Sequence, residues 1–287
     1  MVLQAQIRER FNELSPALQQ VARYLLDHPA AVITQSMRAV GAQAGSTPAT
    51  LVRFAQHLGF SGWPQLKTAL TQEMGLGADA YGARARQLVG RARHACLADE
   101  MFEVQRRNLE TTHAHSAPAL ARTCVLVEKA STVHAAGFRA CFPIAFSFVY
   151  QYRLFRPSVQ LIDGQGGSLE MQQRALARGD ALLVCSFAPY SREALQTAEA
   201  ARQAGCRIVA LTDSAASPLS LLAQETLLFS NDSPSFFPSV AAGLALAESL
   251  VEMLASRAGK AVVRRIDAAE RQLFESGAYL QAPQPRT

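Results

Sequence analysis

The chain has 287 residues, of which 49% are hydrophobic and 18% charged, and its net charge is +5. This composition excludes a globally disordered chain, and the length predicts one large domain or two ordinary ones. No apolar run reaches the roughly 18 to 20 residues of a membrane-spanning helix. The opening MVLQAQIRERFNEL is charged where a signal peptide is apolar. We therefore expect a cytoplasmic protein.

The five cysteines are widely spaced and include no CxxC pair, so we expect neither a disulfide framework nor a metal site. No motif indicates a cofactor, and none is expected. Positive charges exceed negative ones by two in residues 1–75 and by two in residues 76–130. This weak basic bias permits a nucleic-acid partner for the first part of the chain without requiring one.

The first 74 residues follow helical spacing, and we predict no strand among them. Helices are expected near residues 4–14, from Pro16 to just before Pro29, at 37–44, at 48–58 and from Trp63 onward. Proline suits the first position of a helix, and the run of apolar residues at every third or fourth position supplies each helix with one buried face.

Two of these predicted helices form a recognisable pair. Ser36 caps a short helix, Gly45-Ser46 breaks it, and Thr47-Pro48 begins the next helix, whose apolar stripe starts at Leu51. Two short helices separated by a turn that contains glycine have the spacing of a helix-turn-helix, in which the second helix reads DNA. A plain helical bundle with a solvated polar face is the alternative.

The polar face of this second helix, together with Lys67 on the helix that begins at Trp63, supplies the predicted DNA contacts. Arg53 and Thr50 are expected at base edges, and Thr47 and Lys67 at phosphates. The full predicted set of DNA-binding residues is Thr47, Pro48, Thr50, Arg53, His57 and Lys67.

Two blocks of this region resemble a known family. Residues 47–54 (TPATLVRF) and 58–63 (LGFSGW) are similar to the N-terminal signature of the RpiR/MurR family of bacterial transcription regulators. Thr47 stands where that family has serine, and Trp63 stands for its aromatic residue. The resemblance implies an operator-binding helix-turn-helix domain over residues 1–75.

Residues 76–107 are predicted to be a helical connection. Their arginines, Arg84, Arg86, Arg91 and Arg93, suit a solvated helix, or alternatively a supplementary contact to DNA phosphates. We expect a helix over 99–107 and then a loop-like segment with His113 and His115. An HxH pair without a third ligand does not predict a metal site.

From Thr132 onward, short apolar runs alternate with helical stretches. This alternation predicts a doubly wound α/β domain with a parallel sheet. The expected strands are 133–136, 159–162, 181–186, 208–211 and 226–229, and the expected helices are 141–154, 169–177, 191–204 and 238–257.

In such folds ligands bind beyond the carboxyl ends of the strands, where helix N-termini offer N–H groups to anions. This rule selects the loops 137–141, 163–168, 186–193 and 212–217. Ordinary turn and capping chemistry explains any one of these residues equally well. The predicted effector-binding residues are Gly137, Arg139, Cys141, Ser186, Tyr190, Ser191, Arg192, Glu193, Asp213 and Ser214.

This half resembles a SIS domain, the flavodoxin-like sugar-phosphate isomerase fold that RpiR/MurR regulators carry behind the helix-turn-helix. The stretches 180–186 (DALLVCS) and 204–213 (AGCRIVALTD) match the sequence pattern of that domain, but the phosphate loops differ from the pattern. In the first loop, Arg139 and Cys141 replace the family's Gly and Ser. Because an arginine fork can bind a carboxylate or phosphate at two points, we expect an anionic effector, either a phosphosugar or a related sugar acid.

Cys141 is predicted at a helix N-terminus beside Arg139, where a reactive thiolate and a buried small side chain are alternative roles. The expected domains are 1–75, a helical linker at 76–107, a SIS-like domain at 108–280 and a disordered tail at 281–287. The tail reads QAPQPRT.

Two functions follow from these observations. The first is a DNA-binding repressor, a homodimer or tetramer, that a small anionic metabolite releases from double-stranded operator DNA. The second is a sugar-phosphate isomerase or lyase with an accessory helical domain. Because no paired acid and base is visible beside the predicted loops, we expect no enzymatic activity.

Overall fold

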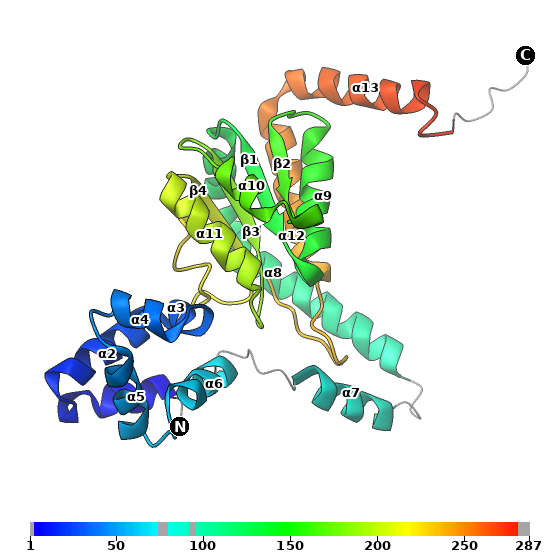
Figure 1. Ribbon diagram of the computed structural model, residues 1–287. Helices are drawn as coiled ribbons and strands as arrows, with labels where there is room; N and C mark the ends of the chain where they lie inside the picture. Colours follow the sequence, from blue (N-terminus) through cyan, green and yellow to red (C-terminus); the bar gives the residue numbers. More distant parts are fainter. Residues whose placement is uncertain (1–2, 74–79, 92–95, 281–287) are drawn as a thin grey trace, which may run out of the picture. The chain divides into compact units, whose positions relative to one another are not determined.

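The computed structural model describes residues 3–73, 80–91 and 96–280. The chain divides into two compact units, a helical head formed mainly by residues up to Ala83 and an α/β body formed mainly by residues from Arg84 onward. Figure 1 labels most of the elements of both. The predicted disordered tail at 281–287 lies outside the described residues.

The head is helical throughout its described residues, as the sequence predicts. Pro29 ends α2 as expected, but it also begins a further short helix, because proline is favoured at the first helical position. The elements of the head are α1 (Leu3–Glu9), η1 (Phe11–Glu13), α2 (Pro16–Asp27), α3 (Pro29–Thr34), α4 (Met37–Gln43), α5 (Pro48–His57) and α6 (Trp63–Glu73).

One hydrophobic core holds the head together. The stripe of α5 that the sequence predicts, Leu51 and Phe54, is fully buried, and it packs in one cluster with Leu25 of α2 and Leu66 of α6. Fully burying each such side chain stabilises the head by about 1.5–3 kcal/mol, so α5 is fixed with its polar side outward.

Two helices come next in the chain, α7 (Ala80–Arg91) and α8 (Leu97–Glu128). The loop predicted around His113 and His115 is wrong, since both residues lie exposed within α8. Arg84, Arg86 and Arg91 are exposed on α7, and Arg91 forms an ion pair with Glu100. Arg93 lies outside the described residues.

The body contains, in its described residues, five parallel strands in the order β2-β1-β3-β4-β5, which confirms the predicted flavodoxin-like doubly wound class. Helices α8, α9 and α12 share a core cluster on one face of the sheet, and α11 packs on the other (Figure 1). The elements are β1 (Val133–Gly137), η2 (Arg139–Cys141), α9 (Phe142–Arg153), β2 (Val159–Ile162), η3 (Gln165–Gly167), α10 (Leu169–Arg174), β3 (Ala181–Cys185), α11 (Arg192–Ala204), β4 (Arg207–Thr212), β5 (Glu225–Leu228), α12 (Ala241–Ala258) and α13 (Lys260–Glu275).

Helix α8 is bound to the chain that leaves β5 through a row of buried polar side chains at every fourth position. Ser116 Oγ donates to the carbonyl of Leu228 at 2.6 Å, and Thr112 Oγ1 accepts from the N–H of Ser230 at 2.9 Å. Asn108 donates to the carbonyl of Asp232 at 2.8 Å. These side chains satisfy main-chain groups that lie beyond the end of the sheet.

A spanning helix needs both length and apolar composition, and none of the described helices combines the two.

Candidate functional site

The turn between α4 and α5 depends on two glycines. Gly45 adopts φ +60°, and a Cβ there would lie 2.5 Å from Gln20 Nε2. A Cβ on Gly41 would lie 3.0 Å from the carbonyl of Ser46. Thr47 then caps α5, because its hydroxyl accepts from the N–H of Thr50 at 3.3 Å. The predicted helix-turn-helix is therefore built locally from glycine conformation and a threonine cap.

The outer side of α5 carries the predicted reading residues. Thr47, Pro48, Arg53 and His57 are exposed and Thr50 is half-buried, while the opposite side of the helix is buried in the core. Gln56 is exposed too, and the sequence analysis missed it. Its spacing of three residues from Arg53 was the available signal, since residues three and four apart share a helix face.

Lys67 lies on α6, where its ammonium donates to the carbonyl of Gln35 at 2.9 Å. Partial burial lowers the pKa of Lys67 from its usual value. Because this ammonium already has a main-chain acceptor, the phosphate contact assigned to it stays a prediction.

In the body, an open hollow of about 440 Å³ lies beyond the carboxyl ends of β1 and β2. Three of the predicted effector residues line it together. The lining residues are Gly137, Phe138, Arg139, Phe142, Asp163, Gln165 and Glu193. The sequence analysis had selected the loop that contains Asp163 and Gln165 but not these side chains.

Gly137 allows the start of α9 to approach the end of β1. A Cβ at this position would lie 2.4 Å from the carbonyl oxygen of Cys141 and 2.8 Å from Ala145 Cβ. Both distances are shorter than real contacts, so only glycine fits, and the helix N-terminus is held against the strand end where an anion can meet it.

Arg139 combines unusual backbone geometry with a defined partner. Its φ is +52°, the left-handed region that favours glycine. Arg139 Nη1 donates to Glu193 Oε2 at 2.6 Å across the hollow. This hydrogen bond raises the pKa of Arg139, which keeps the guanidinium charged. The side chain of Arg139 is 68% exposed and that of Glu193 30% exposed.

The remaining predicted effector residues occupy several places. Cys141 and Ser186 are buried at the start of α9 and just beyond the end of β3. Tyr190 and Ser191 are half-buried on the loop that precedes α11, and Arg192 is the exposed first residue of that helix. The half-buried Asp213 and Ser214 follow β4. The structure thus gathers Gly137, Arg139 and Glu193 in one hollow, and the part played by the others stays a prediction.

The thiol of Cys141 packs against a second cysteine. Cys185, at the end of β3, is hydrogen-bonded to Cys141, and burial raises the pKa of Cys185 well above its usual value, with the contact to Cys141 as the next cause. A buried thiol of raised pKa is a poor nucleophile, and this applies to Cys185. Cys141 is buried as well, and its burial favours the packing role over the reactive one. Among the described residues no group of three or more His, Cys, Asp or Glu side chains is placed to hold a metal ion.

Comparison with known proteins matches two regions of the chain. Residues 1–76 match the helix-turn-helix domain of the rpiR family, and residues 126–256 match the SIS domain. The chain is 28% identical over 219 residues to the HTH-type transcriptional regulator HexR of Pseudomonas aeruginosa, which covers 75% of this chain and 74% of that protein.

Two solved structures share the fold. The structure of the Vibrio vulnificus NanR protein complexed with ManNAc-6P has a TM-score of 0.58 at 20% identity, over 96% of this chain and 100% of the chain in that structure. The sugar isomerase domain of an RpiR transcription factor from Sphaerobacter thermophilus has a TM-score of 0.58 at 20% identity, over 63% of this chain and 99% of that domain. These likenesses show a shared architecture.

Proposed function

Because the chain belongs to the RpiR family of helix-turn-helix regulators and carries a SIS domain, we propose that it is a repressor released from its operator by a small anionic sugar derivative. The observation that carries the proposal is the exposed face of α5, which presents Arg53 and His57. This helix is capped by Thr47 and follows a turn that depends on glycine. The head reads double-stranded DNA, and the body senses the metabolite.

The proposed reading mode follows from the chemistry of α5. An arginine can contact the O6 and N7 atoms of guanine with two hydrogen bonds, and Arg53 is exposed for that contact. Thr50 lies one turn earlier, and Thr47 and Pro48 lie at the N-terminus, where main-chain N–H groups meet phosphates. As in other helix-turn-helix proteins, a homodimer or tetramer would place two such helices on the half-sites of a palindromic operator.

The proposed ligand is a phosphosugar or a related sugar acid. Arg139 supplies one guanidinium for the anionic group, and Glu193 supplies a carboxylate that can accept hydrogen bonds from sugar hydroxyls. The related NanR structure contains ManNAc-6P, a phosphorylated sugar, which supports this class. A ligand that takes the Nη1 donor of Arg139 would displace Glu193, and such binding is expected to rearrange the loop after β1.

The isomerase alternative is less well supported by the same residues. Glu193 is the carboxylate beside the third strand-end loop, and it is engaged by Arg139. His134 lies buried within β1, where its Nε2 is 3.2 Å from Asp180 Oδ2. Asp180 also accepts hydrogen bonds from the N–H groups of Thr132 and Ala177. The pair of His134 and Asp180 therefore has a structural role. We therefore propose a regulator without catalytic activity.

A release assay tests this proposal. The full chain is bound to a duplex from the upstream region of its own gene, and N-acetylmannosamine 6-phosphate, 6-phosphogluconate, gluconate and inorganic phosphate are titrated in turn. We expect at least one phosphorylated or acidic sugar to release the DNA at concentrations where inorganic phosphate does not, because the hollow offers groups for hydroxyls as well as for the anion.

The same compounds are then incubated with the protein and followed for turnover by NMR. Conversion of a sugar phosphate at a catalytic rate, with no effect on DNA binding, would replace the regulator with the isomerase alternative. Release by every anion in proportion to its charge would show only salt screening of DNA contacts and would contradict an effector site in the body.

A further inference from the structure

Helix α7 is strongly basic. Between Asp79 and Asp99 the sequence contains four arginines and no acidic residue. Three of these arginines, Arg84, Arg86 and Arg91, lie on α7, and all three are exposed. They belong neither to the DNA-reading face of α5 nor to the hollow beyond β1 and β2. Helix α7 is therefore a separate charged surface that suits an anionic partner.

Two of the three arginines are available to such a partner. Arg91 forms an ion pair with Glu100 at the start of α8, so its charge is already balanced within the chain. Arg84 and Arg86 form no ion pair with any residue in the described ranges 3–73, 80–91 and 96–280. These two guanidinium groups carry positive charge that the described part of the chain leaves unbalanced.

Packing holds α7 only weakly. None of the side chains of α7 whose burial is described is fully buried, and Val89 is 75% exposed. A helix of 12 residues is marginal in water unless other groups pack against it. A partner that contacts the arginines would therefore stabilise the helix itself as well as gain affinity from their charge.

The chain joins α7 to the head by a short connection. Six residues, 74–79, separate Glu73 at the end of α6 from Ala80 at the start of α7. A connection of this length spans at most about 25 Å, even when it is fully extended. One turn of a DNA duplex is about 34 Å long. A duplex bound by the head therefore extends further than this connection, and α7 can reach its phosphates.

We propose that Arg84 and Arg86 contact phosphates of the operator duplex outside the half-site that α5 reads. This inference rests on the proposed function, to which it adds a second DNA-contacting element. Arginine suits the role because its planar guanidinium can donate two hydrogen bonds to one phosphate. Contacts of this kind fix the position of the protein on the duplex and add salt-dependent affinity, but they do not read the base sequence.

An anionic membrane surface is the other partner typical of a basic helix. Helices that lie on membranes bury large side chains such as Trp, Phe and Leu in the lipid. Helix α7 has the sequence AYGARARQLVGR, in which alanine and glycine occupy most of the apolar positions. These residues offer little surface for burial in lipid. The composition of α7, and its short connection to a helix-turn-helix head, favour DNA.

Fluorescence anisotropy of the full chain tests the proposal, with the upstream duplex and a scrambled duplex at about 50 to about 200 mM salt. The variant carries Arg84→Ala and Arg86→Ala together, since alanine is the best helix former. Each lost phosphate contact lowers the slope of log affinity against log salt by about 0.9. Over this salt range the wild type should therefore lose about 10-fold more affinity than the variant. The ratio of the affinities for the two duplexes should stay unchanged.

A variant with Arg174→Ala and Arg178→Ala is the matched control, because it removes the same charge from two exposed positions on the body. It should keep the wild-type slope. A variant with Arg84→Lys and Arg86→Lys should keep most of the slope as well, because an ammonium group also neutralises a phosphate. Circular dichroism and thermal melting establish that each variant is folded.

The two proposals fail in different ways. If the Arg84 and Arg86 alanine variant has the slope of the control, α7 does not contact DNA, whereas a retained preference for the upstream duplex leaves operator reading intact. If the wild type shows no such preference, operator reading is contradicted, and the slopes still decide whether α7 contacts DNA. An unchanged slope, together with binding to phosphatidylglycerol vesicles that the alanine variant loses, would assign α7 to a membrane surface and overturn the proposal.

Discussion

Arg139 combines a strained backbone conformation with a side chain that forms an ion pair with Glu193. A left-handed φ costs an L-residue roughly 1–2 kcal/mol, which glycine avoids. Arg139 adopts φ +52° and places its guanidinium 2.6 Å from Glu193. Strained residues are often retained for a functional reason, so the positive φ of Arg139 is consistent with the proposal that its guanidinium contacts the effector.

Arg139→Gly separates the two effects. The substitution relieves backbone strain of about 1 kcal/mol, which offsets the loss of an exposed ion pair of about 0–1 kcal/mol, so thermal melting should stay unchanged or rise. Affinity for the releasing sugar, measured by calorimetry, should fall at least about 10-fold because the charged two-point contact is lost.

Arg139→Lys is the control, because it keeps the charge and the strained backbone but loses the planar fork. It should melt like the wild type and bind the sugar with intermediate affinity. If Arg139→Gly binds the sugar as tightly as the wild type, Arg139 is not an effector contact.

At the scale of elements, sequence patterns predict apolar faces well and polar ones poorly. The strands of the body and the caps of α5 lie within about a residue of their predicted positions, because continuous apolar runs and Thr47-Pro48 are strong local signals. The prediction ended this helix at residue 107, although α8 continues to Glu128, because the buried positions that follow are polar. Their partners in β5 and the segment after it are more than 100 residues away. The pairing of Arg139 with Glu193 could not be predicted either, because 54 residues separate them in the sequence.

The buried polar side chains of α8, Asn108, Thr112 and Ser116, are expected to contribute to the free energy of unfolding of the body. Thr112→Val removes the acceptor of the Ser230 N–H and leaves that group unsatisfied, which should destabilise the body by about 1–3 kcal/mol in urea unfolding. Thr111→Val, the exposed neighbour on the same helix, is the matched control and should change stability by no more than about 0.5 kcal/mol. Equal effects of the two substitutions would show that the row of hydrogen bonds does not hold α8 in place.

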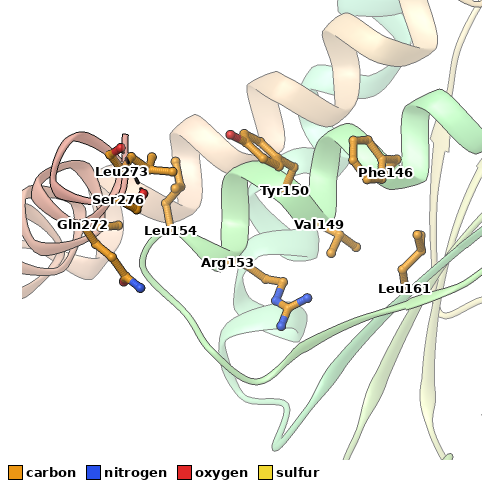
Figure 2. Close-up of a pocket in the computed structure, with 10 residues that line it drawn as sticks. Phe146, Val149, Tyr150, Arg153, Leu154, Leu161, Gln272, Leu273 and Ser276 are labelled. Carbon is orange, nitrogen blue, oxygen red and sulfur yellow. Dashed lines mark hydrogen bonds between the residues drawn. The ribbon is translucent and has the colours of Figure 1, made fainter. Parts of the chain in front are cut away.

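At the scale of the whole molecule, the proposed regulation requires that operator binding by the head and sugar binding by the body are thermodynamically coupled. A sugar that weakens operator binding by a given factor must itself be bound more weakly by the DNA complex, by the same factor. Helical periodicity, the alternation of apolar runs with helical stretches, and the family motifs predicted a helical head followed by an α/β domain. These patterns could not predict the groove of about 430 Å³ between α9 and α13 that Figure 2 shows, because that groove forms only when helices from distant parts of the chain are packed.

The most direct test of the central claim is fluorescence anisotropy of the full chain with its upstream duplex and with a scrambled duplex, across a salt series. The wild type should prefer the upstream duplex strongly, with affinity that falls as salt rises. Arg53→Ala should weaken specific binding at least about 10-fold, whereas Arg8→Ala, an exposed arginine on α1, should leave the preference intact. Binding that is indifferent to sequence, and that both substitutions weaken equally, would contradict operator reading by α5.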